Sequence, residues 1–126
     1  MILRRFLTHS GGASAVEFSL TAPVFFAIVF GLIDFGLLLW TQLGLQHATE
    51  LAARCASVNK TICADATAIK TYASTQVFGM TVPASVFTVS QIACGNKITA
   101  SYDFGMIGGF YGTPLVTLNA EACFPK

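Results

Sequence analysis

Four cysteines are the residues of this sequence best suited to covalent chemistry. Cys55, Cys63, Cys94 and Cys123 all follow a long apolar run that ends near Trp40. Zinc sites need paired short spacings such as Cys-x-x-Cys, which these four positions lack. An even number of cysteines confined to one side of an apolar run is typical of disulfides formed in an oxidising compartment. We therefore expect two disulfides and no bound metal.

Two carboxylates stand in or beside the apolar run, where a charge is costly. Glu17 is at its threshold and Asp34 lies within it. Glu17 either sits at the level of the lipid headgroups, near the positive end of the helix dipole, or takes part in subunit contacts. For Asp34 we favour helix packing in an assembly over a snorkelling position near the outer interface. Pro23 removes one helix hydrogen bond and marks either a simple irregularity or a packing feature.

The remaining polar residues form no catalytic constellation. His9 lies near the N-terminus, and His47 has no Cys, His or Asp partner at ligand spacing. The sequence contains no phosphate-binding loop and no Ser/His/Asp or Cys/His set. The formal net charge of +1 gives no reason to expect a nucleic-acid partner. We predict a protein that is not an enzyme, has no cofactor and binds no small-molecule substrate.

The apolar run predicts a membrane-spanning helix. A hydrocarbon core of about 30 Å needs about 20 apolar residues, and residues 18–39 meet that length. The run is longer than the apolar region of a cleaved secretory signal, which has about 7–15 residues. Arg4 and Arg5 precede the run, and the next basic residue is Arg54. This distribution places the N-terminus in the cytoplasm and the cysteines outside, with Trp40 at the membrane–water boundary.

The glycine before Glu17 offers a second interpretation of this carboxylate. If the chain is cut after Gly12, Ala13 gains a free amine and Glu17 becomes the fifth residue of the mature chain. The amine of one subunit would then neutralise the Glu17 carboxylate of a neighbour. Such pairing would lower the free-energy cost of placing the Glu17 charge inside an apolar helical core.

This arrangement resembles a known signal. Gly12, four further residues, Glu17-Phe18 and an uninterrupted apolar helix resemble a class III prepilin signal, which prepilin peptidases cut. The longer string of residues 10–18, with Ala22-Pro23 and the Gly-Leu-Ile-Asp-Phe-Gly of residues 31–36, is similar to the TadE-like family. Members of that family are pseudopilins or minor pilins of the tight-adherence (Tad, Flp-type) pilus. Major Flp pilins are little more than the helix, whereas this chain continues into a substantial globular part.

The resemblance implies a leader at 1–12, a transmembrane helix at 13–40 and an extracytoplasmic head at 41–126. It implies a single-pass protein of the bacterial inner membrane with a periplasmic or extracellular head, incorporated into a pilus for adhesion or secretion. Its partners would be other pilins or pseudopilins, a prepilin peptidase, the Tad assembly platform and membrane lipid. The alternative is an uncleaved bitopic protein whose disulfide-stapled head binds a ligand or an envelope partner.

The residues after the span predict a small pilin-like α+β head. Helical spacing continues past Trp40, so we expect one helix from about Ser14 to Val58, with a weak point at Gly44. Asp65 caps a second helix that runs through about Val77. Alternating apolar residues then predict three antiparallel strands and a turn between the first two. The strands are expected at 86–92, 98–102 and 115–122, and the turn at Gly95-Asn96.

The expected elements suggest which cysteines pair. Cys55 and Cys63 bracket the break after the long helix, and their spacing suits a disulfide if the chain turns back to within about 6 Å. An up-down-up sheet brings Cys94 and Cys123 to one end, although the central strand separates the two edges and some curling would be needed. The loop at 105–112, with Phe104 before it, is either a contact surface for another subunit or a cover over the core.

Overall fold

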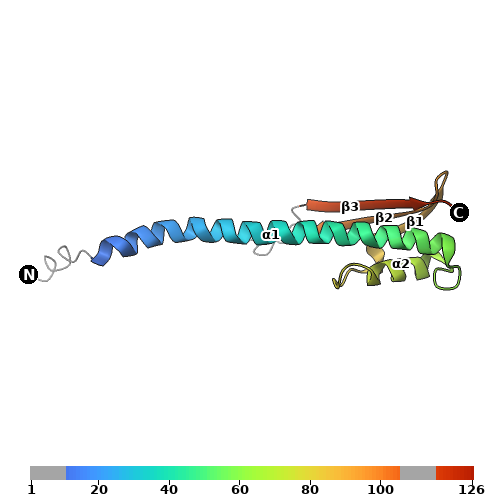
Figure 1. The fold of residues 1–126 in the computed structure, drawn as a ribbon, viewed down its shortest axis with the longest axis horizontal. Helices are drawn as coiled ribbons and strands as arrows, with labels where there is room; N and C mark the ends of the chain where they lie inside the picture. The colour runs from blue at the N-terminus through green and yellow to red at the C-terminus, as the bar shows by residue number, and fades with distance from the viewer. Residues whose placement is uncertain (1–10, 106–115) are drawn as a thin grey trace, which may run out of the picture. The chain divides into compact units, whose positions relative to one another are not determined.

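The computed structural model of the protein describes residues 11–105 and 116–126 (Figure 1). Two helices and a short 3-10 turn precede three strands, which form one antiparallel sheet in the order β1-β2-β3. The α+β class and the long N-terminal helix predicted from the sequence are confirmed. The elements are α1 (Gly11–Val58), α2 (Ala66–Thr75), η2 (Ala84–Val86), β1 (Phe87–Ile92), β2 (Gly95–Phe104) and β3 (Val116–Phe124).

Helix α1 is 48 residues long and contributes to both compact units of the chain, which divide between Phe35 and Gly36. Pro23 lies inside the helix without ending it. Just before Pro23, the hydroxyl of Ser19 donates to the carbonyl of Val16 at 2.8 Å, and that of Thr21 donates to the carbonyl of Glu17 at 3.0 Å. Both hydroxyls bond carbonyls of the preceding turn rather than the Ser19 carbonyl, which loses its amide donor at Pro23.

The second unit, residues 36–126, has one hydrophobic core formed by α1, α2 and one face of the sheet. Helix α1 contributes Leu45 and a row of alanines at positions 48, 52 and 56, which share one face of the helix because they are spaced by four. The sheet contributes Phe87 and Ile98, both fully buried. The small alanine side chains leave room for these larger residues close to the helix backbone.

The two faces of the sheet differ because side chains alternate along each strand. Ile98 of the central strand lies between Val89 of β1 and Ala122 of β3, on the core face. The opposite face is polar: Lys97 forms an ion pair with Glu121 at 2.7 Å across β2 and β3. The sheet therefore has one packed side and one polar side.

Helix α1 also runs along strand β3, which is an edge of the sheet (Figure 1). The Gln42 side-chain amide donates to the carbonyl of Asn119 at 2.9 Å, and that of Gln46 donates to the carbonyl of Glu121 at 3.4 Å. Open strand edges are sites of unwanted pairing between chains. The two glutamines occupy carbonyl groups of β3 that a second chain would otherwise use.

The hairpin turn lies two residues earlier than predicted. Ile92 pairs with Gly95, so Ala93 and Cys94 form the turn and the predicted Gly95-Asn96 pair belongs to β2. Gly95 has a φ of 122°, and a Cβ at this position would overlap the backbone carbonyl of Phe124. The glycine therefore serves a close approach to the C-terminal residues rather than the turn.

Helix α2 starts as predicted and ends two residues early. The Asp65 carboxylate accepts a hydrogen bond from the Ala68 amide at 2.8 Å, which caps the first turn. The helix stops at Thr75, because the chain then turns toward α1, with Val77 fully buried and positive φ at the two following residues. Contact with α1, rather than a local helix breaker alone, sets this end.

Helix α1 continues through Gly44 without interruption, so the weak point expected there is absent. Gly44 is instead a packing position. A Cβ built on it would lie 3.1 Å from side-chain atoms of Val77 and Met80. The missing side chain of Gly44 lets the segment after α2 cross the helix closely.

Candidate functional site

The apolar side chains of α1 between Val16 and Trp40 are largely exposed. Among the described residues, α1 provides one candidate membrane span, Ser14–Val58, whose most apolar window has a mean hydropathy of 2.3 and is 6% buried. Its length and composition suit a bilayer core, and so large an apolar surface requires cover by lipid or protein. Before Trp40, the large apolar residues that are at least half exposed are Val16, Phe18, Leu20, Val24, Phe25, Phe26, Ile28, Phe30, Leu32 and Phe35.

The residues of the predicted processing site lie in the first turns of α1. Gly12 and Ala13 are helical, and a Cβ added to Gly12 would meet no atom within 4 Å. Glu17 is exposed, and Phe18 beside it is 70% exposed. Leader residues 1–10 lie outside the described residues. Cleavage after Gly12 stays a prediction, and so does a role for Glu17 in contacts between subunits.

The two other positions predicted for helix packing differ in their surroundings. Asp34 is 6% exposed, whereas Ile33 and Phe35 on either side are 49% and 59% exposed. Pro23 is exposed. Glu17 and Asp34 are separated by about 25 Å along the helix at 1.5 Å per residue, so they act at separate places.

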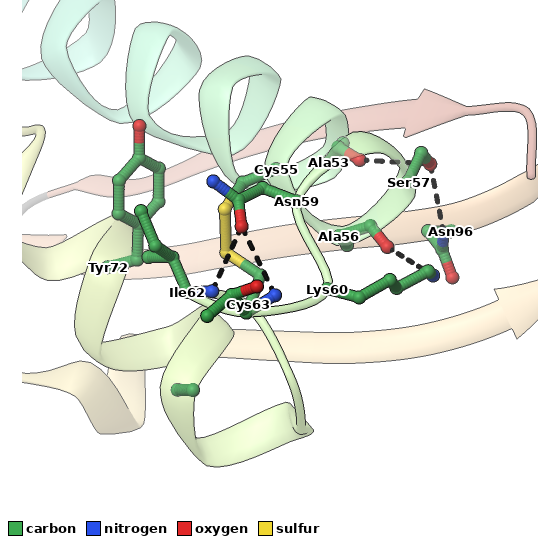
Figure 2. Close-up of a disulfide and its surroundings, with 12 residues drawn as sticks. Ala53, Cys55, Ala56, Ser57, Asn59, Lys60, Ile62, Cys63, Tyr72 and Asn96 are labelled. Carbon is green, nitrogen blue, oxygen red and sulfur yellow. Dashed lines mark hydrogen bonds between the residues drawn. A yellow bond between two sulfur atoms is a disulfide. The ribbon is translucent and has the colours of Figure 1, made fainter.

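The first disulfide fastens the C-terminal end of α1 (Figure 2). Cys55 and Cys63 are bonded, with their Cα atoms 5.9 Å apart. Between them, the Asn59 side-chain oxygen accepts hydrogen bonds from the amides of Thr61 and Ile62 at 3.1 and 3.0 Å. The turn that the sequence predicted after α1 is therefore present, and the pairing of these two cysteines is confirmed.

The second predicted disulfide, Cys94–Cys123, is also present, with its Cα atoms 6.3 Å apart. Cys94 lies in the hairpin turn rather than at the end of β1, and Cys123 is opposite Lys97 in the register of β2 and β3. Because Gly95 has no side chain, the C-terminal end of β3 comes close to the turn. The disulfide thus joins the turn between β1 and β2 to β3 at the end of the central strand, so it does not have to cross that strand.

The hollows of the head are shallow and lack a catalytic arrangement in the part of the chain that the structure describes. A groove of about 550 Å³ beside α2 is lined by Ile62, Tyr72 and a row of threonines. The hydroxyls of Thr71 and Thr75 donate to backbone carbonyls of α2 at 3.0 and 2.7 Å. No group of three or more metal-ligating side chains occurs within residues 11–105 and 116–126.

An aromatic cluster near the end of the apolar run was only partly visible in the sequence. Phe78 stacks on His47, with ring centroids 4.9 Å apart, and lies 5.5 Å from the ring of Trp40. Sequence reasoning pointed to Trp40 but missed Phe78. The available signal was the position of Phe78 directly before Gly79. Neither strand alternation nor helix periodicity assigns this phenylalanine to an element.

The predicted apolar loop after β2 is only partly described. Phe104 was expected to be exposed at its start, but this residue ends β2 and is 8% exposed, because it faces the core. Gly105 is exposed, and residues 106–112 lie outside the described residues.

Comparison with protein families gave a match for part of the N-terminal half of the chain. Residues 12–54 match the family model described as TadE-like protein. This segment is similar to the TadE-like family. The match begins at the predicted cleavage glycine, includes Glu17, Pro23 and Asp34, and ends directly before Cys55. Comparisons with curated proteins and with solved structures gave no match. The matched segment therefore lies within α1, and the four bonded cysteines and the sheet all lie beyond residue 54.

Proposed function

We propose that this chain is a non-enzymatic, membrane-anchored pseudopilin or minor pilin, cleaved after Gly12, that takes part in assembling a Tad (Flp-type) pilus for adhesion or secretion. The TadE-like match supports a role connected with the Tad pilus. The observation that carries the finer proposal is the exposed apolar surface of α1, joined to a separately packed head.

That surface suits two environments in turn. Burying one large apolar side chain is worth about 1.5–3 kcal/mol, so a helix with ten such residues exposed is stable only when it is covered. Lipid covers the helix in the membrane, and the helices of neighbouring subunits cover it in a filament. The head, with its own core and two disulfides, stays folded in both.

Glu17 is the residue most affected when α1 moves from the membrane into a bundle of subunit helices. A carboxylate is costly in an apolar helical bundle unless it is paired. Cleavage after Gly12 would create a free amine on Ala13. The exposed Glu17 carboxylate of a neighbouring subunit would accept a hydrogen bond from this amine and neutralise its charge. Asp34 is already buried within the chain, so Glu17 is the better candidate for the contact between subunits.

The proposed topology has the N-terminus in the cytoplasm and the head outside the inner membrane. Arg4 and Arg5 support this orientation through the positive-inside rule. Both disulfides support it as well, since disulfides persist in the periplasm and beyond rather than in the cytosol. Its partners would be a prepilin peptidase, the Tad assembly platform and other pilins.

Mass spectrometry of the membrane-extracted protein tests the processing step. We expect a mature chain that begins at Ala13, and we expect Gly12→Val to retain the leader and to block incorporation into pili. An intact leader on the native chain, with pilus assembly unaffected by Gly12→Val, would exclude this proposal and favour the uncleaved bitopic protein.

Glu17→Ala tests the pairing. The variant should enter the membrane normally, because removing a charge does not hinder insertion, but its amount in sheared pili should fall several-fold. Ser19→Ala is the matched control: Ser19 lies two residues further along α1, and its hydroxyl bonds only to the local carbonyl of Val16 among the hydrogen bonds described. Equal incorporation of both variants would contradict a subunit-joining role for Glu17.

A further inference from the structure

Trp40, Leu43 and Phe78 form an exposed apolar patch on the second unit, here named the aromatic ledge. Their exposed fractions are 53%, 61% and 44%. Trp40, Leu43 and His47 recur at intervals of three and four residues, so they lie on one face of α1. Phe78 comes from the segment after α2, and its ring lies between those of Trp40 and His47, 5.5 and 4.9 Å away.

The backbone holds Phe78 in this place at a cost. Its φ is 29°, in the left-handed region that bulky side chains rarely adopt. The neighbouring Val77 is fully buried and packs near Gly44 of α1. One edge of the Phe78 ring also lies near Gly44, but 44% of this side chain remains exposed. Packing against α1 therefore accounts for Val77 fully and for one side of the Phe78 ring, while the other side of that ring stays uncovered.

The position of the ledge along α1 indicates what covers it. It begins where the apolar run ends, directly after the exposed Leu37 and Leu39. Tryptophan side chains concentrate at the boundary between headgroups and acyl chains, and the apolar side chains of Leu43 and Phe78 beside Trp40 would gain free energy by leaving water there. Continuity with the apolar run therefore favours lipid over a second protein.

We propose that the aromatic ledge is a lipid-contact surface, through which the head sits on the bilayer interface while the protein resides in the membrane. Trp40 alone would mark the end of the span. Phe78 and Leu43 extend the contact to the next turn of α1 and bring the segment after α2 to the membrane surface. The inference rests on the membrane-anchored part of the proposed function and is independent of leader cleavage and pilus incorporation.

The test uses the single tryptophan of the chain as its probe. The full-length protein is reconstituted in phosphatidylcholine–phosphatidylglycerol vesicles, with brominated phosphatidylcholine as the lipid quencher and iodide as the aqueous quencher. Trp40→Phe provides a background without tryptophan, into which Phe78→Trp and Leu43→Trp are introduced separately. Val58→Trp is the matched control, because Val58 is 70% exposed on the same helix and about 27 Å beyond position 40.

We expect bromine near the headgroup end of the acyl chain to quench the native protein, Phe78→Trp and Leu43→Trp, with little loss of emission for Val58→Trp. Iodide should give the reverse order. If bromine and iodide quench the tryptophans at 43 and 78 to the same extent as the tryptophan at 58, the proposed lipid contact is absent. If both are shielded from bromine and iodide alike, a protein surface covers the ledge and the proposal is also wrong.

Leu43→Trp keeps the test decisive if Phe78→Trp fails to fold, since the Leu43 side chain is largely exposed. Folding is checked by mapping of the two disulfides. If bromine does not quench Trp40 in the native protein, the chain is not inserted in the membrane. That outcome would contradict the proposed function itself. The mass of the mature chain from the same vesicles reports leader cleavage separately.

Discussion

Gly95 occupies a backbone position that an L-residue with a side chain would disturb. Its φ of 122° lies in the region used almost only by glycine, and an added Cβ would also approach the Cα of Pro125 to 2.8 Å. The position stands beside the Cys94–Cys123 bridge and at the pairing of Ile92 with β2. One hydrogen atom in place of a methyl group thus permits the hairpin and the C-terminal residues to meet.

Gly95→Ala should lower the free energy of unfolding of the head by about 3 kcal/mol, since backbone strain and steric overlap add. Denaturant titration of the full chain in detergent, followed by near-UV circular dichroism, measures this loss. Gly105→Ala is the control, because an added Cβ there would meet no atom within 4 Å and its φ is not positive. Equal stability of the two variants would contradict the role assigned to Gly95.

At the scale of elements, the contact between α1 and the segment after α2 connects the helix to the rest of the head. The hydroxyl of Thr41 lies 3.6 Å from the sulfur of Met80, and Val77 and Met80 both lie against Gly44. The same contact ends α2 and presents Phe78 on the aromatic ledge. A change at Gly44 should therefore affect both the packing and the exposed surface.

Gly44→Leu should overpack this contact and destabilise the head by about 1–3 kcal/mol, with displacement of Phe78 from His47. Gly36→Leu is the matched control on the same helix, because an added Cβ there meets no atom within 4 Å. Chemical shifts of the His47 ring, in detergent, would report loss of the stacked phenylalanine. An unchanged His47 environment in Gly44→Leu would show that the segment does not depend on the missing side chain.

At the scale of the molecule, the two disulfides crosslink different regions of the head. Cys55–Cys63 joins residues eight apart and fixes the end of α1, whereas Cys94–Cys123 joins residues 29 apart and links the hairpin to the last strand. The longer loop restricts the unfolded chain more strongly. The second bridge should therefore contribute more to the stability of the head.

Replacing Cys94 and Cys123 by serine should cost about 3.5 kcal/mol, and replacing Cys55 and Cys63 about 2.5 kcal/mol, by the loop-entropy relation. Denaturant titration of the two double variants in detergent gives the comparison. The order of the two losses is the sharper expectation, because the absolute values depend on residual structure in the unfolded state. A larger loss for the Cys55–Cys63 variant would contradict it.

The sequence by itself determined the features that depend on local pattern and length. The apolar run predicted a helix long enough to span a membrane, and the Gly12–Glu17 spacing indicated the TadE-like family that residues 12–54 match. Alternation predicted three strands, and the element order suggested both cysteine pairs. These inferences succeeded because periodicity and spacing act between residues that are close in the chain.

Only the tertiary structure decided the contacts between distant residues. The approach of Gly95 to Phe124 moved the hairpin turn to Ala93-Cys94, and the crossing at Gly44 ended α2 and exposed Phe78. Whether a glycine marks a turn, a helix break or a close approach depends on which surface lies opposite it. That surface comes from elsewhere in the sequence, so no local pattern records it.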